Sequence, residues 1–239
     1  MTKETNLEQI KDVALQFLYL EPEPNPTFSF VVAHPFFDSP IFPILQENKR
    51  YKYINILSST EELEEARQYL KQKIQNASDV YQILHMIRKA DKRTFFKYIQ
   101  RYLSVEEYGQ LLRDVWTQTE FPHFDINVKK SEFLSYFKKA KPKSLMDAEE
   151  METYLQLPDT ITIYRGIHTK KYYPALSWTL SLNTAKFFAN RFDKKGMVYQ
   201  TDIPKSAILA YFAGEEEVIV DYKQIDKTKL QIVSKGENV

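Results

Sequence analysis

The hydrophobic pattern of this chain changes its period once, at the tripeptide Leu157-Pro158-Asp159. Upstream, apolar residues recur three and four positions apart, as they do on one face of a helix. Downstream, apolar and polar residues alternate and predict six short strands, at residues 160–166, 173–179, 196–203, 207–212, 217–222 and 229–233. A single helix with a cap at Asn183 separates the second of these strands from the third. Helices followed by strands predict an α+β fold, in which a helical N-terminal part precedes a mainly antiparallel sheet.

We expect two regions along the chain. Residues 1–75 are predicted to form a helix, a proline-rich extended stretch and a second helix that Ser59 and Glu62 cap. Residues 28–33 could pair at a sheet edge, and His34 is predicted to be a packed or surface histidine. The role of this segment is open. Residues 76–239 are expected to form one domain, with a helical part at 76–156 and a β-rich part at 157–239.

Composition excludes several classes of site. The 239 residues carry a formal net charge of +1, which argues against a large nucleic-acid surface. The chain has no cysteine, so neither disulfides nor cysteine-ligated zinc can form, and we expect no metal site. The N-terminus has no continuous apolar core of a signal peptide, and no segment is apolar enough to cross a bilayer. These features predict a cytoplasmic protein without a membrane partner.

The chain is poor in glycine, with only 5 residues of this type. Neither a P-loop nor a dinucleotide-binding fingerprint is present, because both motifs need closely spaced glycines. A nucleotide bound by this chain must therefore be held by side chains and strand edges.

Candidate site residues lie at the ends of the predicted strands. Arg165 precedes Gly166, where the missing side chain would let a ligand come close. Ser177 and Thr179 are two residues apart on a predicted strand, so they share a face, while Trp178 faces the other way and packs. Taken alone, an arginine at this position is more often a surface residue in an ion pair than a ligand clamp.

Three consecutive acidic residues precede the apolar run of residues 218–220. On the alternation of a strand, Glu215 and Glu217 would share one face and Glu216 would point away. The simplest alternative is a solvated acidic turn that leads into a strand.

In their order and spacing these residues resemble the ADP-ribosyltransferases whose signature is Arg, then Ser-Thr-Ser, then Glu-x-Glu. The matching segments are "YRG" with Arg165, "SWT" at Ser177 to Thr179, and "EEE" at Glu215 to Glu217. Ala185 matches a small residue that packs the helix after the Ser-Thr-Ser strand. The resemblance covers the last third of the chain and is closest to short members found in phage and prophage genes. Two departures are Trp178 in place of the middle Thr and a short interval from Arg165 to Ser177.

The resemblance implies a split sheet that binds NAD as a substrate and no metal. Glu217 would stabilise the positive charge that develops on the ribose when nicotinamide leaves. Ser177 would orient Glu217, and Arg165 would bind the diphosphate, with Gly166 and Thr179 lining the cofactor site. Glu215 would orient and deprotonate an arginine side chain of an acceptor protein.

The sequence leaves two other functions open. An NAD glycohydrolase would use the same residues, with water in place of the acceptor. A non-catalytic interaction module could share the fold, although such a module need not keep Arg165, Ser177 and Glu217. A generic α+β domain without an NAD site is the remaining alternative.

Overall fold

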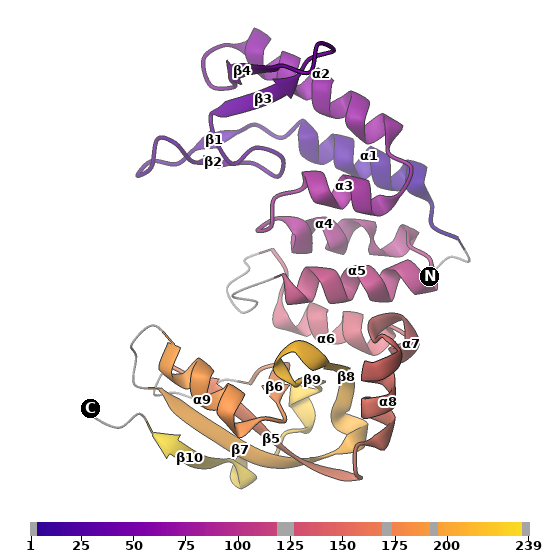
Figure 1. Ribbon diagram of the computed structural model, residues 1–239, viewed down its shortest axis with the longest axis vertical. Coiled ribbons are helices and arrows are strands. Elements are labelled where there is room, and N and C mark those ends of the chain that lie inside the picture. The colour runs from indigo at the N-terminus through magenta and orange to yellow at the C-terminus, as the bar shows by residue number, and fades with distance from the viewer. Residues whose placement is uncertain (1–3, 119–126, 169–173, 192–195, 236–239) are drawn as a thin grey trace. The chain divides into compact units, whose positions relative to one another are not determined.

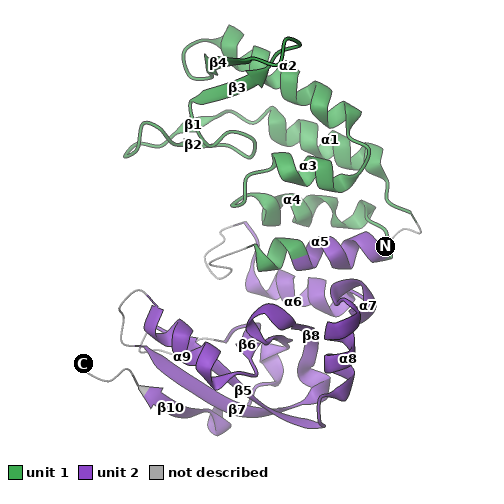
Figure 2. Ribbon diagram, viewed as in Figure 1, with its two compact units in different colours: residues 1–105, 114–120 green, residues 106–113, 121–239 purple. Residues whose placement is uncertain are grey.

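The computed structural model describes residues 4–118, 127–168, 174–191 and 196–235. The chain divides into two compact units (Figure 2): residues 1–105 with 114–120, and residues 106–113 with 121–239. We call them unit 1 and unit 2. Helix α5 (Val105–Thr117) contributes residues to both units. The boundary expected near residue 75 lies inside unit 1, close to the end of α2 (Thr60–Asn76).

Unit 1 is built on helices that pack side by side (Figure 1): α1 (Leu7–Leu18), α2, α3 (Val80–Met86) and α4 (Lys92–Ile99). Their apolar stripes form its core, because Ile10, Ile74 and Phe95 are fully buried. The proline-rich stretch between α1 and α2 forms two small antiparallel sheets. One pairs β1 (Glu23–Pro24) with β2 (Val32–Ala33), and the other pairs β3 (Ile41–Leu45) with β4 (Tyr51–Asn55).

Two local predictions in unit 1 are confirmed. His34 is packed, at 2% exposure; its Nδ1 accepts from the Phe36 amide (3.0 Å) and its Nε2 lies 3.1 Å from the Leu20 carbonyl oxygen. Burial lowers the pKa of His34 to about 4, so the ring is neutral at neutral pH. Ser59 caps α2, since its hydroxyl accepts from the amide of Glu62 (3.2 Å), whereas the carboxylate of Glu62 accepts from the amide of Asn55 (3.0 Å).

Unit 2 contains the second half of the predicted helical part, α6 (Lys130–Lys139), α7 (Pro142–Leu145) and α8 (Ala148–Gln156). Its strands are β5 (Thr160–Ile167), β6 (Ser177–Thr179), β7 (Met197–Pro204), β8 (Ile208–Phe212), β9 (Glu217–Val220) and β10 (Gln231–Lys235). All six predicted strands are therefore present in the described residues. They form one sheet in the order β10-β7-β5-β6-β9-β8, with antiparallel pairing at each step. The α+β fold class with a mainly antiparallel sheet is confirmed.

Helix α9 (Leu182–Asn190) covers one face of β5 and β7 (Figure 1). It begins after the cap Ser181, whose hydroxyl accepts from the amide of Thr184 (3.2 Å), so the predicted cap at Asn183 is wrong. Ala185 is fully buried against the sheet, as predicted. A Cβ at Gly166 would lie 1.9 Å from the Ala185 carbonyl oxygen. Close packing of α9 therefore requires this glycine, whereas the sequence suggested space for a ligand.

The last turn of α6 is tied to the sheet by an ion pair. Lys138 Nζ lies 2.6 Å from Oδ2 of Asp221, which is 3% exposed and follows β9 directly. Burial raises the pKa of Asp221, but hydrogen bonds from Lys138, Gln224 and the Lys223 amide outweigh burial and hold it below its usual value. The Lys138 side chain is itself 48% exposed, so a partly solvated lysine neutralises a buried carboxylate.

Candidate functional site

The three segments of the motif lie on neighbouring strands. Arg165 is in β5, Ser177 and Thr179 begin and end β6, and Glu217 begins β9. In the sheet, β6 lies between β5 and β9, with Tyr164 opposite Thr179 and Thr179 opposite Glu217. Two neighbouring strand pairings, β5 with β6 and β6 with β9, therefore bring together residues that lie up to 52 positions apart in the sequence.

Arg165 bridges the gap between β5 and β6. These strands pair at only one position, Tyr164 with Thr179, whereas β5 pairs along its whole length with β7. Next to that position, the Arg165 guanidinium donates to the main-chain carbonyl of Ser177. A side chain that bonds the backbone of the adjacent strand lies between the two strands. The half-buried guanidinium is thus oriented by β6 itself.

Ser177 and Glu217 lie on one face of the sheet. Directly opposed residues of an antiparallel ladder carry their side chains on the same face, so Glu217 shares the face of Thr179. Ser177 is two residues from Thr179 and shares that face as well. Ser177 and Glu217 are therefore diagonal neighbours, with an expected separation of about 7–8 Å. A glutamate side chain can span much of that distance toward a serine hydroxyl.

The acidic triplet does not form a strand. Ala213–Glu215 is a single 3-10 turn, Glu216 is left-handed (φ 47°, ψ 39°), and β9 begins only at Glu217. The period-two alternation predicted for Glu215 to Glu217 is therefore wrong. Glu215 and Glu216 are both exposed, whereas Glu217 is half-buried.

Thr179 joins the acidic turn to the end of β6. Its hydroxyl donates to the carbonyl of Glu215 (2.8 Å) and accepts from the amide of Ser181 (3.0 Å). The Leu180 amide adds a third bond, to the carbonyl of Glu216 (2.9 Å). Thr179 is 6% exposed, so the structure gives it a role in holding the turn, which the sequence did not suggest.

The charge of Glu216 acts on Tyr211 of β8. Tyr211 of β8 lies opposite Val218, so its ring is on the face that Glu217 does not share. Burial, followed by the negative charges of Glu216 and Glu150, raises the pKa of Tyr211.

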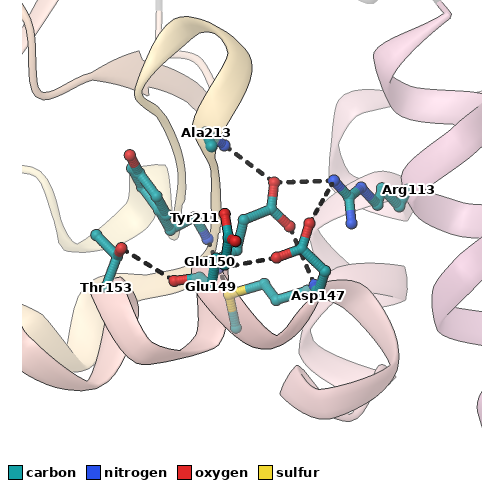
Figure 3. Close-up of polar contacts among 8 residues, drawn as sticks. Arg113, Asp147, Glu149, Glu150, Thr153, Tyr211 and Ala213 are labelled. Atoms are coloured by element: carbon teal, nitrogen blue, oxygen red, sulfur yellow. Dashed lines mark hydrogen bonds and ion pairs between the residues drawn. The ribbon is translucent and has the colours of Figure 1, made fainter.

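A buried carboxylate holds the other end of the acidic turn (Figure 3). Glu150 of α8 is 3% exposed, and its Oε1 accepts from the amide of Ala213 (3.0 Å) and from Arg113 of α5 (2.8 Å). Its Oε2 accepts from the Asp147 amide (3.1 Å). Arg113 also lies 3.7 Å from the Asp147 carboxylate, and its guanidinium is 5.4 Å from the centre of the Phe212 ring. The turn is therefore held at Ala213 by Glu150 and at Glu215 by Thr179.

This arrangement places a carboxylate and a hydroxyl on one face of the sheet. Tyr164 shares that face, so the side chain of the next residue, Arg165, starts from the other face and is turned between the strands by its bond to the Ser177 carbonyl. Such a set can stabilise developing positive charge and bind an anionic group. No protein-family model, curated protein or solved structure matches this chain. Among the described residues, no group of three or more His, Asp or Glu side chains could hold a metal ion. Within the same residues, no helix is both long and apolar enough to cross a membrane.

Sequence reasoning missed the residues that hold the site from outside the sheet. Asp147 and Glu150 have the spacing of a helix capping box, and each does accept from the amide of the other. That signal predicts the start of α8. It does not predict that Glu150 also binds Arg113 and Ala213, because both contacts join segments far apart in the chain.

Proposed function

We propose that this chain is a mono-ADP-ribosyltransferase that uses NAD to modify an arginine side chain of an acceptor protein. The observation that carries this proposal is the juxtaposition of Arg165, Ser177 and Glu217 on β5, β6 and β9. Their order in the chain resembles the Arg, Ser-Thr-Ser, Glu-x-Glu signature of that family. The antiparallel sheet, in which β5 and β6 pair at one position only, is compatible with the split sheet that the resemblance implies.

In the proposed reaction, the bond between C1′ of the ribose and the nicotinamide nitrogen breaks. Nicotinamide leaves as a neutral molecule with the bonding electrons, and positive charge develops on the ribose. The carboxylate of Glu217 stabilises this charge more in the transition state than in the ground state. Ser177, its diagonal neighbour, orients the carboxylate. Arg165 offers a planar set of donors to the diphosphate, in place of a glycine-rich loop.

Transfer then needs a nucleophile. A guanidinium nitrogen of the acceptor forms the new bond to C1′ and loses a proton. Glu215 is exposed in the turn directly before Glu217, and its main chain is held by Thr179. We assign Glu215 the acceptor side of the reaction, where it orients the incoming guanidinium and takes its proton.

Changing Glu215 to glutamine is expected to separate transfer from hydrolysis. We expect Glu215→Gln to lower transfer to arginine about a hundredfold while NAD hydrolysis falls less than about threefold, because water needs less help than a protonated guanidinium. Labelled acceptor and free nicotinamide are measured in parallel. Glu216→Gln, in the same exposed turn, is the matched control and should keep both rates. Equal losses of transfer and hydrolysis in Glu215→Gln would remove the specific acceptor role.

A conservative change of Arg165 tests diphosphate binding. Arg165→Lys is expected to weaken NAD binding about tenfold, because an ammonium group cannot reproduce a planar two-pronged contact. Calorimetric titration with NAD measures the affinity. Arg191→Lys, at an exposed position after α9, is the control and should bind NAD like the wild type. Unchanged affinity in Arg165→Lys would limit Arg165 to a structural role, such as its bond to the Ser177 carbonyl.

A further inference from the structure

Lys130, in the first turn of α6, contacts the segments that flank the candidate site. Its Nζ donates to the carbonyl of Pro174 (2.7 Å) and lies 4.5 Å from the centre of the Tyr222 ring. Both of these groups, a main-chain carbonyl and a tyrosine ring, are uncharged. Pro174 lies just before β6, and Tyr222 begins the turn after β9. The ammonium group of Lys130 therefore lies near the end of the strand pair at which Ser177 begins β6, whereas Glu217 begins β9 at the opposite end.

Lys130 and Arg165 bind the same short segment. Arg165 donates to the carbonyl of Ser177, three residues after the carbonyl of Pro174 that Lys130 binds. Three residues of extended chain span at most about 10 Å. Two cations from distant parts of the sequence, a helix start and a strand, thus converge on one stretch of main chain.

A third cation, Lys227, lies five residues after Tyr222 on the segment that follows β9. Lys227 is exposed in the turn formed by Lys227–Lys229. Burial, followed by the positive charges of Arg165 and Lys227, lowers the pKa of Lys130 below its usual value. Like charges repel one another, and an anion bound between Lys130 and Arg165, which bind carbonyls only three residues apart, would remove that cost.

We propose that Lys130 and Lys227 complete, with Arg165, a binding site for the diphosphate of a dinucleotide. The inference deepens the proposed function and rests on it for the identity of the ligand. A diphosphate carries two negative charges, so one arginine leaves part of its charge unmatched. Lys130 would act as a point charge on the second phosphate, and the more exposed Lys227 would contribute less. Both lysines lie outside the sequence motif, so they extend the site beyond the residues that the motif contains.

Calorimetric titration of the full chain with inorganic pyrophosphate, and separately with ADP-ribose, tests this site. We expect Lys130→Gln to lower the affinity for both ligands at least tenfold. The affinities of Lys130→Arg, which keeps the positive charge, should stay within about threefold of those of the wild type. Lys129→Gln removes an exposed positive charge from the adjacent residue and should bind like the wild type. Lys227→Gln, at an exposed position that packing does not constrain, should lower the affinity for both ligands about threefold. If Lys130→Gln fails to fold, the affinities of Lys227→Gln decide the outcome.

The outcomes separate this inference from the proposed function. Failure of the wild type to bind pyrophosphate and ADP-ribose, or equal losses in Lys129→Gln and Lys130→Gln, would overturn the diphosphate site. If Lys130→Gln does not fold, unchanged affinity for both ligands in Lys227→Gln would also overturn the diphosphate site. Binding that depends on Lys130, in a chain that releases no nicotinamide from NAD, would support the site and reject the transferase. NAD cleavage with an unchanged KM in Lys130→Gln would support the enzyme and reject the site.

Discussion

Replacement of Glu217 by glutamine is expected to lower nicotinamide release from NAD about a hundred- to a thousandfold, the range found when one electrostatic contact to a transition state is lost. Glutamine keeps the size of the side chain but not its negative charge, and the charge is what stabilises the ribose as nicotinamide leaves. The fold should survive, because β9 is held at this position by main-chain pairing with Thr179 and Phe212. Release of nicotinamide is followed by chromatography, with circular dichroism as the check on folding.

Glu216→Gln is the matched control for this experiment. It removes the same charge one residue away, from an exposed side chain. We expect it to release nicotinamide at the wild-type rate. A near wild-type rate in Glu217→Gln, or equal losses in the two variants, would mean that Glu217 is not the catalytic carboxylate.

Removal of the cation beside Glu150 is expected to destabilise unit 2. Arg113→Met keeps much of the side-chain length but leaves the carboxylate of Glu150, at 3% exposure, without its ion-pair partner. Breaking a buried pair in this way costs several kcal/mol, and because Arg113 itself is 30% exposed we expect the low end, about 3 kcal/mol. Urea unfolding measures the loss. The fluorescence of Trp178 reports on unit 2 when Trp116 is replaced by phenylalanine in every variant compared.

A second substitution tests the reason for this loss. The double variant Arg113→Met with Glu150→Gln should be more stable than Arg113→Met alone, because a neutral amide costs less to bury and still accepts from the Ala213 amide. Arg191→Met, at an exposed arginine of the same unit, should change the free energy of unfolding by less than about 0.5 kcal/mol. Equal stability of Arg113→Met and Arg191→Met would show that Glu150 needs no buried partner.

The strands of the sheet could be predicted because their signal is local. Alternation of side chains and bounding turn residues identified all six, and the change of period after residue 156 separated them from the helices. The start of α9 was misplaced by two residues, since Ser181 and Asn183 are both good capping residues and sequence alone does not choose between them. The strand pair β3 and β4 was missed because Pro43 argues against a strand, although a two-stranded sheet tolerates proline on its outer edge.

The candidate site was only partly predictable. The residues Arg165, Ser177 and Glu217 were chosen from their order in the chain, and the ladder pairing brings their strands together. The conformation of the acidic turn could not be read from the sequence, because Glu216 adopts a left-handed backbone that is uncommon outside glycine. Lys130 and Glu150 could not be identified either, since each acts on segments that only the tertiary fold brings near.

Incubation of the purified chain with NAD carrying separate labels on nicotinamide and on adenine tests the proposed transferase. We predict that nicotinamide is released and that the adenine label becomes attached to an arginine-bearing acceptor protein. Both signals should disappear in Glu217→Gln. Release of nicotinamide with all of the adenine label in free ADP-ribose would indicate hydrolysis in place of transfer. Recovery of intact NAD from a folded chain supplied with acceptor protein would contradict the proposal.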